Sequence, residues 1–595
     1  MPLSTIATVI RNTQPALLAA KQSTSGASVR YCQRSRANRP GLSSRLCCQK
    51  NRAPWWLGTL VCAISMLSFV TVAAAEPPAE VALSLVPSGA PASSLSTEAA
   101  VTARVGQLRK KISEFLGGGL LRRLHVGLTV RDAQTGELMI SHNATAPFNP
   151  ASNTKILTTG AALSVLGADY RYRTVLLGPA VSSAEADSSD ASGSSKDGVI
   201  HGSVFLQGSG DPSLTPAGLV QLAMELRRQD IHRIEGDVLI DSQFRDLKQL
   251  TAQPGAPVYG PGALMINRDS YTVRVEPGSV GRSANAWVDP RSAFFRLHNL
   301  AKTVRGKKSR LWIDHSLIGD HMVVTLRGRI GSQRGRVALR KRLGNSTAWA
   351  AAILSQALAD FGITLSGQVR IGAAPPGPYR ILAEHLSEPL SEICRIVNKD
   401  SNNFVADVIF KTLGAERFGL PGTLEKGARA VAEWLEPQGV SPAQVKVVNG
   451  SGLTYENRIR PGDLEQILYR LYHSLSLGPV FLQTLAVGGV DGTIHHRFRG
   501  PMVGQVRGKT GTLNGVSVLS GYVGAQPGVL IFTIFVEGFR NRRLDAIRQL
   551  QARIVEELHR YLRAEVSVQS APVLPVVTTP EAAPPESESE EQEAN

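Results

Sequence analysis

Three short strings of reactive side chains lie far apart in this chain of 595 residues and constrain its fold more than any other feature. They are Ser152-Asn153-Thr154-Lys155, Ser401-Asn402-Asn403 and Lys509-Thr510-Gly511. Each string is common by chance, but all three in this order are rarely accidental. A fold that uses them together must bring Ser152 and Ser401, which are 249 positions apart, into one site.

The first string combines a nucleophile with a base. A serine hydroxyl is a weak nucleophile at neutral pH and needs a nearby base. We expect a helix over Ser152–Leu166, and Lys155 then projects from the same face as Ser152, about one turn later. Burial beside a second cation, Lys509, is expected to lower the pKa of Lys155 so that its amine accepts a proton. The alternative is a solvated Ser/Lys pair on a helix surface.

The second string lies in a polar run, Asn398–Asn403, between two expected helical stretches. Ser401 can relay a proton between Lys155 and a leaving amine, and Asn403 can bond a substrate amide. The alternative is an asparagine-rich turn or helix cap.

The third string is part of an expected edge strand over Arg507–Leu513, whose glycines permit close backbone approach. A peptide could add alongside this strand, with Lys509 and the hydroxyls of Thr510 and Thr512 meeting a carboxylate. The N–H groups of Thr512 and Ser152 would complete an oxyanion hole. The alternative is a Gly/Thr edge strand that its lysine keeps soluble.

Periodicity around the strings predicts an α/β (α+β) fold, an antiparallel sheet flanked by helices, built from residues 99–180 and 390–565. Residues 181–389 show alternating short strands and turns and read as a large, mostly-β inserted region. The tail over 566–595 is acidic and should be disordered. The expected helices are 99–116, 152–166, 219–228, 348–361 and 541–563, with further helical sequence over 390–413 on both sides of the polar run. The expected strands include 124–131, 137–141, 504–512, 516–523 and 529–536.

The first 75 residues contain nine Lys/Arg and no acidic residue, and an apolar run from Trp55 to Ala75 ends in three alanines. This pattern predicts a basic leader and signal peptide over 1–75, followed by a Pro/Ala/Ser-rich linker over 76–98. An organellar transit peptide and an uncleaved, membrane-anchored form are the alternatives. Without the nine charges the net charge of +17 falls to +8, which leaves little support for nucleic-acid binding.

Cysteine and histidine placement argues against disulfides and metals. Of five cysteines only Cys394 lies beyond the leader, and we expect it to be a buried helix residue. The adjacent pair His495-His496 lacks the spacing of a zinc site, so no metal and no cofactor is expected.

These strings, with Gly208–Thr215, Gly450–Leu453 and Gly489–Thr493, carry a resemblance. The chain is similar, over about Ala99–Arg563, to low-molecular-mass penicillin-binding proteins of the D-alanyl-D-alanine carboxypeptidase/endopeptidase type, peptidase family S13. The long separation of the first two strings matches the large insertion of that family. One departure is Asn449, where the family usually has aspartate.

The resemblance implies a penicillin-binding-protein/β-lactamase-like transpeptidase domain. It also implies an exported serine peptidase of the periplasm or cell envelope that acts on peptidoglycan stem peptides and is acylated by β-lactam antibiotics. A β-lactamase and a non-catalytic wall-binding or penicillin-sensing module are the alternatives, and the balance of carboxypeptidase to endopeptidase activity stays open. The implied catalytic residues are Ser152, Lys155 and Ser401, and the implied substrate-binding residues are Asn403, Lys509, Thr510 and Thr512.

Overall fold

The structure is a computed structural model that describes residues 94–180, 197–241, 263–344, 346–525 and 528–566. The leader over 1–75, with its apolar run, and nearly all of the tail over 566–595 lie outside the described residues. Helix α1 (Ser94–Gly117) begins within the expected linker over 76–98, earlier than the helix predicted from Ala99. None of the helices within the described ranges is both long and apolar enough to span a bilayer.

A sheet of six antiparallel strands, in the order β18-β19-β20-β21-β1-β2, carries the third string. The expected C-terminal meander is present as β19-β20-β21, and the N-terminal hairpin β1-β2 joins it alongside β21. Segments from both ends of the chain therefore form one sheet. Its strands are β1 (His125–Asp132), β2 (Leu138–His142), β18 (Ala486–Val487), β19 (Val506–Leu513), β20 (Val516–Ala525) and β21 (Gly528–Glu537).

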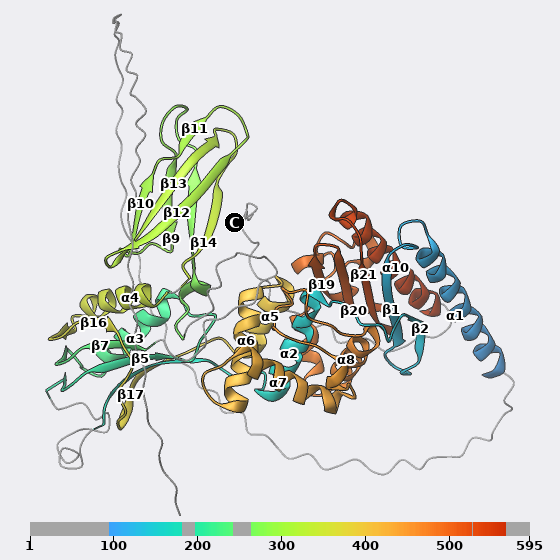
Figure 1. The fold of residues 1–595 in the computed structure, drawn as a ribbon, viewed down its shortest axis with the longest axis horizontal. Coiled ribbons are helices and arrows are strands. Elements are labelled where there is room, and N and C mark those ends of the chain that lie inside the picture. The colour runs from blue at the N-terminus through green and yellow to red at the C-terminus, as the bar shows by residue number, and fades with distance from the viewer. Residues whose placement is uncertain (1–93, 181–196, 242–262, 345, 526–527, 567–595) are drawn as a thin grey trace, which may run out of the picture. The chain divides into compact units, whose positions relative to one another are not determined.

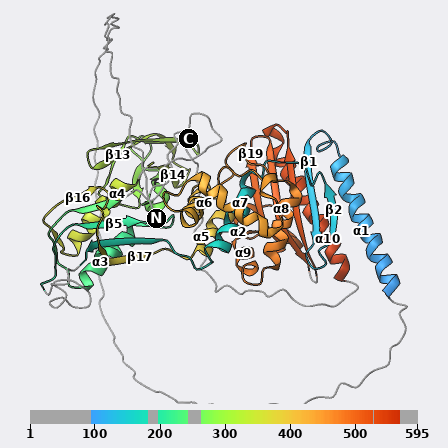
Figure 2. The same cartoon turned by 60° about the horizontal axis from the view of Figure 1, so that its bottom comes forward.

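Helices cover both faces of this sheet, as Figure 1 and Figure 2 show. Alternation along β20 explains the arrangement, because Leu519 and Val523 pack with α1 and α10, whereas Val518 and Tyr522 pack with the helices of the other face. The first face is covered by α1 and α10 (Leu544–Val566), and the second by α2 (Thr154–Val165), α5 (Leu390–Lys399), α6 (Asn403–Phe418), α7 (Leu424–Leu435), α8 (Pro461–His473) and α9 (Gly478–Thr484).

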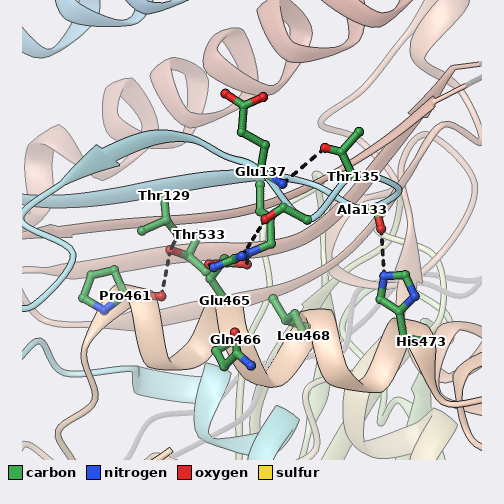
Figure 3. A network of polar contacts seen from close by, with 12 residues as sticks. Thr129, Ala133, Thr135, Glu137, Pro461, Glu465, Gln466, Leu468, His473 and Thr533 are labelled. Atoms are coloured by element: carbon green, nitrogen blue, oxygen red, sulfur yellow. Dashed lines mark hydrogen bonds and ion pairs between the residues drawn. The ribbon is translucent and has the colours of Figure 1, made fainter. Parts of the chain in front are cut away.

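Polar contacts attach α8 to the sheet along its length (Figure 3). At its start, Thr533 Oγ1 on β21 donates to the Pro461 carbonyl at 3.4 Å. Midway, the Arg131 guanidinium contacts both oxygens of the buried Glu465 carboxylate. At its end, His473 Nε2 lies 2.7 Å from the carbonyl of the residue that follows β1. These contacts fix the position of α8, and so of the loop before it, which contributes to the site described below.

The described residues between the first two strings form four further sheets. The chain enters and leaves them through β3 (Arg173–Pro179) and β17 (Tyr379–Leu386), which are neighbours in a five-stranded sheet of order β16-β7-β5-β3-β17. β3 precedes the expected boundary at 181, so this sheet already begins at Arg173. An antiparallel sheet flanked by helices, with additional β-sheets between its halves, confirms the predicted fold class.

The other strands of this β-rich region are β4 (Val199–Ile200), β5 (Val204–Gly208), β6 (Arg233–Ile234), β7 (Val238–Asp241), β8 (Ser270–Glu276), β9 (Asn285–Asp289), β10 (Phe295–Asn299), β11 (Lys302–Val304), β12 (Arg310–Ile318), β13 (His321–Gly331), β14 (Val337–Arg342), β15 (Thr364–Leu365) and β16 (Val369–Ile371). Its helices are α3 (Pro216–Arg228) and α4 (Thr347–Asp360), close to the predicted 219–228 and 348–361.

Candidate active site

The first string lies where a short turn meets a helix. Ser152 is in a 3-10 turn, η1 (Ala151–Asn153), and Lys155 is in the first turn of α2. The helix expected from Ser152 therefore begins with a separate turn. Ala151 has φ 45°, a left-handed conformation that costs a non-glycine residue energy. The Asn149 side chain accepts a hydrogen bond from the Ala151 N–H at 2.7 Å and holds this conformation.

The Lys155 amine is the centre of the polar contacts. Its Nζ lies 3.0 Å from Ser152 Oγ and 2.7 Å from Asn403 Oδ1, and it also donates to the Ser451 carbonyl. Burial of the side chain lowers the pKa of Lys155 to about 7, while the Asp407 carboxylate acts in the opposite direction. An amine with this pKa is neutral about half of the time at pH 7, so it can take the proton of Ser152.

The second string forms the break between α5 and α6. Ser401 adopts φ 57°, and Asn402 caps α6, because its side chain accepts a hydrogen bond from the Val405 N–H at 3.0 Å. Asn403 is the first residue of α6 and reaches Lys155. The helix-cap alternative is therefore correct for Asn402, whereas Ser401 and Asn403 face the site.

The third string contributes a second buried amine. Lys509 Nζ donates to Ser401 Oγ at 2.8 Å and to the Thr510 carbonyl at 3.0 Å. Burial and the positive charge of Lys155 lower the pKa of Lys509 well below its usual value, and Asp400 acts against them. The expected cause of the lowered Lys155 pKa therefore needs correction: burial is the main cause for both amines, and the repulsion between them lowers the pKa of Lys509.

β19 is an edge strand over only part of its length. β18 pairs with Arg507 and Gly508, so the edge predicted for all of Arg507–Leu513 is open only from Lys509 onward. A Cβ at Gly511 would lie 2.7 Å from the Pro150 carbonyl oxygen, so only glycine allows β19 to approach η1 this closely. β19 and the turn that carries the serine therefore lie against each other.

A cavity of about 860 Å³ opens in front of these groups. Lys155 and Lys509 are buried behind the serines that they contact and do not line it. The structure brings all seven predicted site residues together, with hydroxyl and amide groups facing the cavity and both amines behind them. The predicted residues that line the cavity are Ser152, Ser401, Asn403, Thr510 and Thr512.

Sequence reasoning missed the support of Lys155 from the loop before α8. The Ser451 carbonyl accepts from Lys155, and the Ser451 N–H donates to Asp407 Oδ1 at 2.8 Å. Asp407 lies one helical turn after Asn403 on α6, so both reach the same place. The string Gly450–Leu453, which contributes to the family resemblance, is the sequence signal that points to this loop.

Three other expectations concern residues near the site. Asn449 Oδ1 accepts a hydrogen bond from the Gly452 N–H at 3.0 Å, so an acceptor is present despite the departure from aspartate. Cys394 is buried in α5, as predicted. His495 and His496 are exposed and their ring centroids are 3.5 Å apart. No cluster of three metal-ligating side chains occurs within the part of the chain that the structure describes.

The fold, and a serine held beside a buried lysine, define a serine peptidase of the penicillin-binding-protein class. Residues 108–558 match the D-Ala-D-Ala carboxypeptidase 3 (S13) family, and because they make up most of the chain, the protein belongs to this family. The D-alanyl-D-alanine carboxypeptidase of Actinomadura sp. (strain R39) is 30% identical over 458 residues, which cover 73% of this chain and 82% of the relative. The carboxypeptidase DacB of Haemophilus influenzae is 26% identical over 461 residues, 73% of this chain and 91% of the relative.

Solved structures agree on the fold. Penicillin binding protein 4 (dacB) from Haemophilus influenzae superposes with a TM-score of 0.60 at 23% identity, covering 76% of this chain and 99% of that protein. A second structure of that protein, in complex with a β-lactam, gives a TM-score of 0.58 at 24% identity, with coverage of 77% and 99%. The fold is therefore the penicillin-binding-protein fold that the sequence predicted.

Proposed function

We propose that this protein is a serine-type D-Ala-D-Ala carboxypeptidase and D,D-endopeptidase that acts on peptidoglycan stem peptides through an acyl-enzyme on Ser152. The observation that carries this proposal is the 3.0 Å contact between Ser152 Oγ, which faces the cavity, and the buried amine of Lys155. A hydroxyl beside an amine whose pKa is about 7 is an activated nucleophile. Membership of the S13 family supports the substrate class.

Acylation begins when Ser152 Oγ attacks the carbonyl carbon of the penultimate D-alanine and its proton passes to the neutral Lys155 amine. The carbonyl oxygen becomes an oxyanion, which we assign to the N–H groups of Ser152 and Thr512. Asn403 Oδ1 accepts from Lys155 and so keeps the amine directed at the nucleophile.

Collapse of the tetrahedral intermediate breaks the C–N bond, and the leaving amine needs a proton. Ser401 lines the cavity and can pass that proton from Lys155 to the amine. Lys509, 2.8 Å from Ser401 Oγ, orients this hydroxyl and is a positioning residue. Water then attacks the ester carbonyl with Lys155 again as the base, and the shortened stem peptide leaves.

The open edge of β19 suits the peptide part of the substrate. From Lys509 onward none of the described strands pairs with the outer side of β19, so an extended peptide can add there as a further strand. Thr510 Oγ1 donates to Thr493 Oγ1 at 2.8 Å, which fixes the orientation of a hydroxyl that faces the cavity. Asn403, which also lines the cavity, offers its amide to the substrate.

Cellular location and inhibition follow from the same proposal. Stem peptides lie outside the cytoplasmic membrane, so the predicted signal peptide would deliver the enzyme to the periplasm or cell envelope. A β-lactam presents its strained amide carbonyl to Ser152 and forms the same type of ester. The fold shared with a Haemophilus influenzae protein that was solved with a β-lactam supports this step.

Intact-mass analysis after incubation with penicillin tests the proposal. We expect one adduct, located on Ser152 and absent from Ser152→Ala. Ser164→Ala is the matched control, because Ser164 lies on α2, is exposed and donates to the Gly160 carbonyl at 2.8 Å. An adduct that persists in Ser152→Ala contradicts the proposal.

Digestion of purified peptidoglycan distinguishes carboxypeptidase activity from endopeptidase activity, and it distinguishes both from a β-lactamase. Mass spectrometry of the products should show loss of terminal D-alanine and cleavage of cross-linked dimers, both dependent on Ser152. Rapid turnover of a chromogenic β-lactam without either product would instead identify a β-lactamase.

A further inference from the structure

Three arginines that sequence reasoning did not select line the active-site cavity; Arg553 lies over the Phe115 ring, 5.1 Å from its centroid, and the other two are Arg497 and Arg548. Arg548 projects from α10, and its Nη2 donates to Thr512 Oγ1 at 3.4 Å. Arg497 follows the 3-10 turn η5 (Gly492–Ile494), which also carries Thr493, the partner of Thr510. Both guanidinium groups therefore belong to the wall that bears the threonine hydroxyls.

These two cations are close enough to repel each other. Burial, together with the charge of Arg548, lowers the pKa of Arg497 to about 10, so Arg497 is still charged at neutral pH. Two nitrogens, Arg497 Nη1 and Arg548 Nε, are buried without a hydrogen-bond partner among the described residues. Two acids, Asp545 and Glu556, also line the cavity, and the exposed carboxylate of Asp545 is 3.7 Å from Arg548 Nη1. Two neighbouring cations that line one cavity repel each other, so this arrangement fits an anionic ligand.

The substrate in the proposed reaction needs such a cation. The amino acid released from a D-Ala-D-Ala terminus carries a carboxylate on the carbon next to the departing nitrogen. Lys509, which the sequence suggests for this carboxylate, is fully buried, bonds Ser401 and does not line the cavity. The positive charge that faces Thr510 and Thr512 is therefore supplied by the arginines.

We propose that Arg548 and Arg497 form the subsite for the carboxylate of the leaving amino acid, with Thr512 Oγ1 beside it. This inference rests on the proposed function and narrows its substrate class to D,D-peptide bonds whose released amine has a neighbouring carboxylate. Terminal D-alanine meets this requirement. A cross-link does so when the amine released from the acceptor strand belongs to a carbon that also bears a carboxylate.

The test compares a stem peptide ending in D-Ala-D-Ala with the same peptide ending in a carboxamide. For Arg548→Gln and Arg497→Gln we expect kcat/KM on the carboxylate peptide to fall by about ten- to a hundredfold, because a charge-assisted contact is lost, with the carboxamide peptide changed by less than about threefold. Arg560→Gln is the matched control, since Arg560 is on the same helix, pairs with Glu557 one turn earlier and does not line the cavity. It should retain the wild-type preference.

Arg548→Lys keeps the positive charge and should retain part of the preference for the carboxylate peptide. This variant therefore distinguishes the loss of charge from poor folding. An unchanged ratio of the two substrates in both glutamine variants overturns the inference. Failure of the proposed function is a separate outcome, because it would appear as carboxamide hydrolysis or penicillin acylation that does not depend on Ser152.

Discussion

Lys155 and Lys509 lie behind the active-site cavity, whereas Arg497 and Arg548 line it. Burial acts on both kinds of side chain but with different consequences. It lowers the pKa of Lys155 to about 7, where the amine exchanges a proton, whereas the pKa of Arg497 falls only to about 10 and this side chain stays charged. The buried lysines are therefore suited to proton transfer, and the arginines are suited to binding an anion.

The largest effect is expected for Lys155→Met, which removes the base. The rate of penicillin acylation and the kcat on every peptide should fall by about a hundred- to ten-thousandfold, as is typical when a general base is lost. Stopped-flow acylation measures the first quantity. If KM rises while kcat and the acylation rate stay unchanged, Lys155 does not act as the base. The contrast between lysines that transfer protons and arginines that bind an anion would then fail.

Lys509→Met should cost less, because Lys509 acts through Ser401. We expect kcat to fall by about ten- to a hundredfold on carboxylate, carboxamide and ester substrates alike, with little change in KM. Steady-state kinetics on the three substrates checks this. A loss confined to the carboxylate substrate would show that Lys509 contacts the substrate carboxylate. The distinction between the two lysines and the two arginines would then no longer hold.

The pH dependence of acylation tests the lowered pKa of Lys155. The base is the neutral amine, and a lowered pKa makes this form available above pH 7, so the rate should rise as pH increases and level off above about 7. Between pH 7 and 6 the rate should fall about fivefold, since the neutral fraction falls by that factor. The preference for a carboxylate substrate should not change over this range, because Arg497, whose pKa is lowered only to about 10, stays charged there. A rate independent of pH between 5 and 8 would contradict a titrating Lys155.

The smallest effect is expected for Thr512→Val, which removes the hydroxyl beside Arg548 and keeps the backbone N–H. Loss of one neutral hydrogen bond costs about 0.5–1.5 kcal/mol, so kcat/KM on the carboxylate peptide should fall about two- to tenfold. The carboxamide peptide is the control substrate. An equal loss on both would place Thr512 outside the carboxylate subsite.

Much of the fold follows from local pattern. The meander β19-β20-β21, the hairpin β1-β2 and the helices of the site were predictable because alternation and helical spacing depend on neighbouring residues. β18 was not predictable, since a strand of two residues leaves no periodic signal, and it closes part of the β19 edge. The start of the β-rich region at Arg173 was also missed, because β3 joins its sheet only through partners distant in sequence.

The amino-acid sequence was enough to select Ser152, Lys155, Ser401, Asn403 and Lys509 as the candidate site, because they occur in short strings with characteristic spacing. Only the tertiary structure decided how these groups behave. The pKa of Lys155 depends on burial, and burial is produced by elements that meet from three parts of the chain. Arg497 and Arg548 could not be selected from the sequence for the same reason. Arg497 lies in a loop and Arg548 on α10, and they line one cavity only because α10 packs against the sheet beside β19.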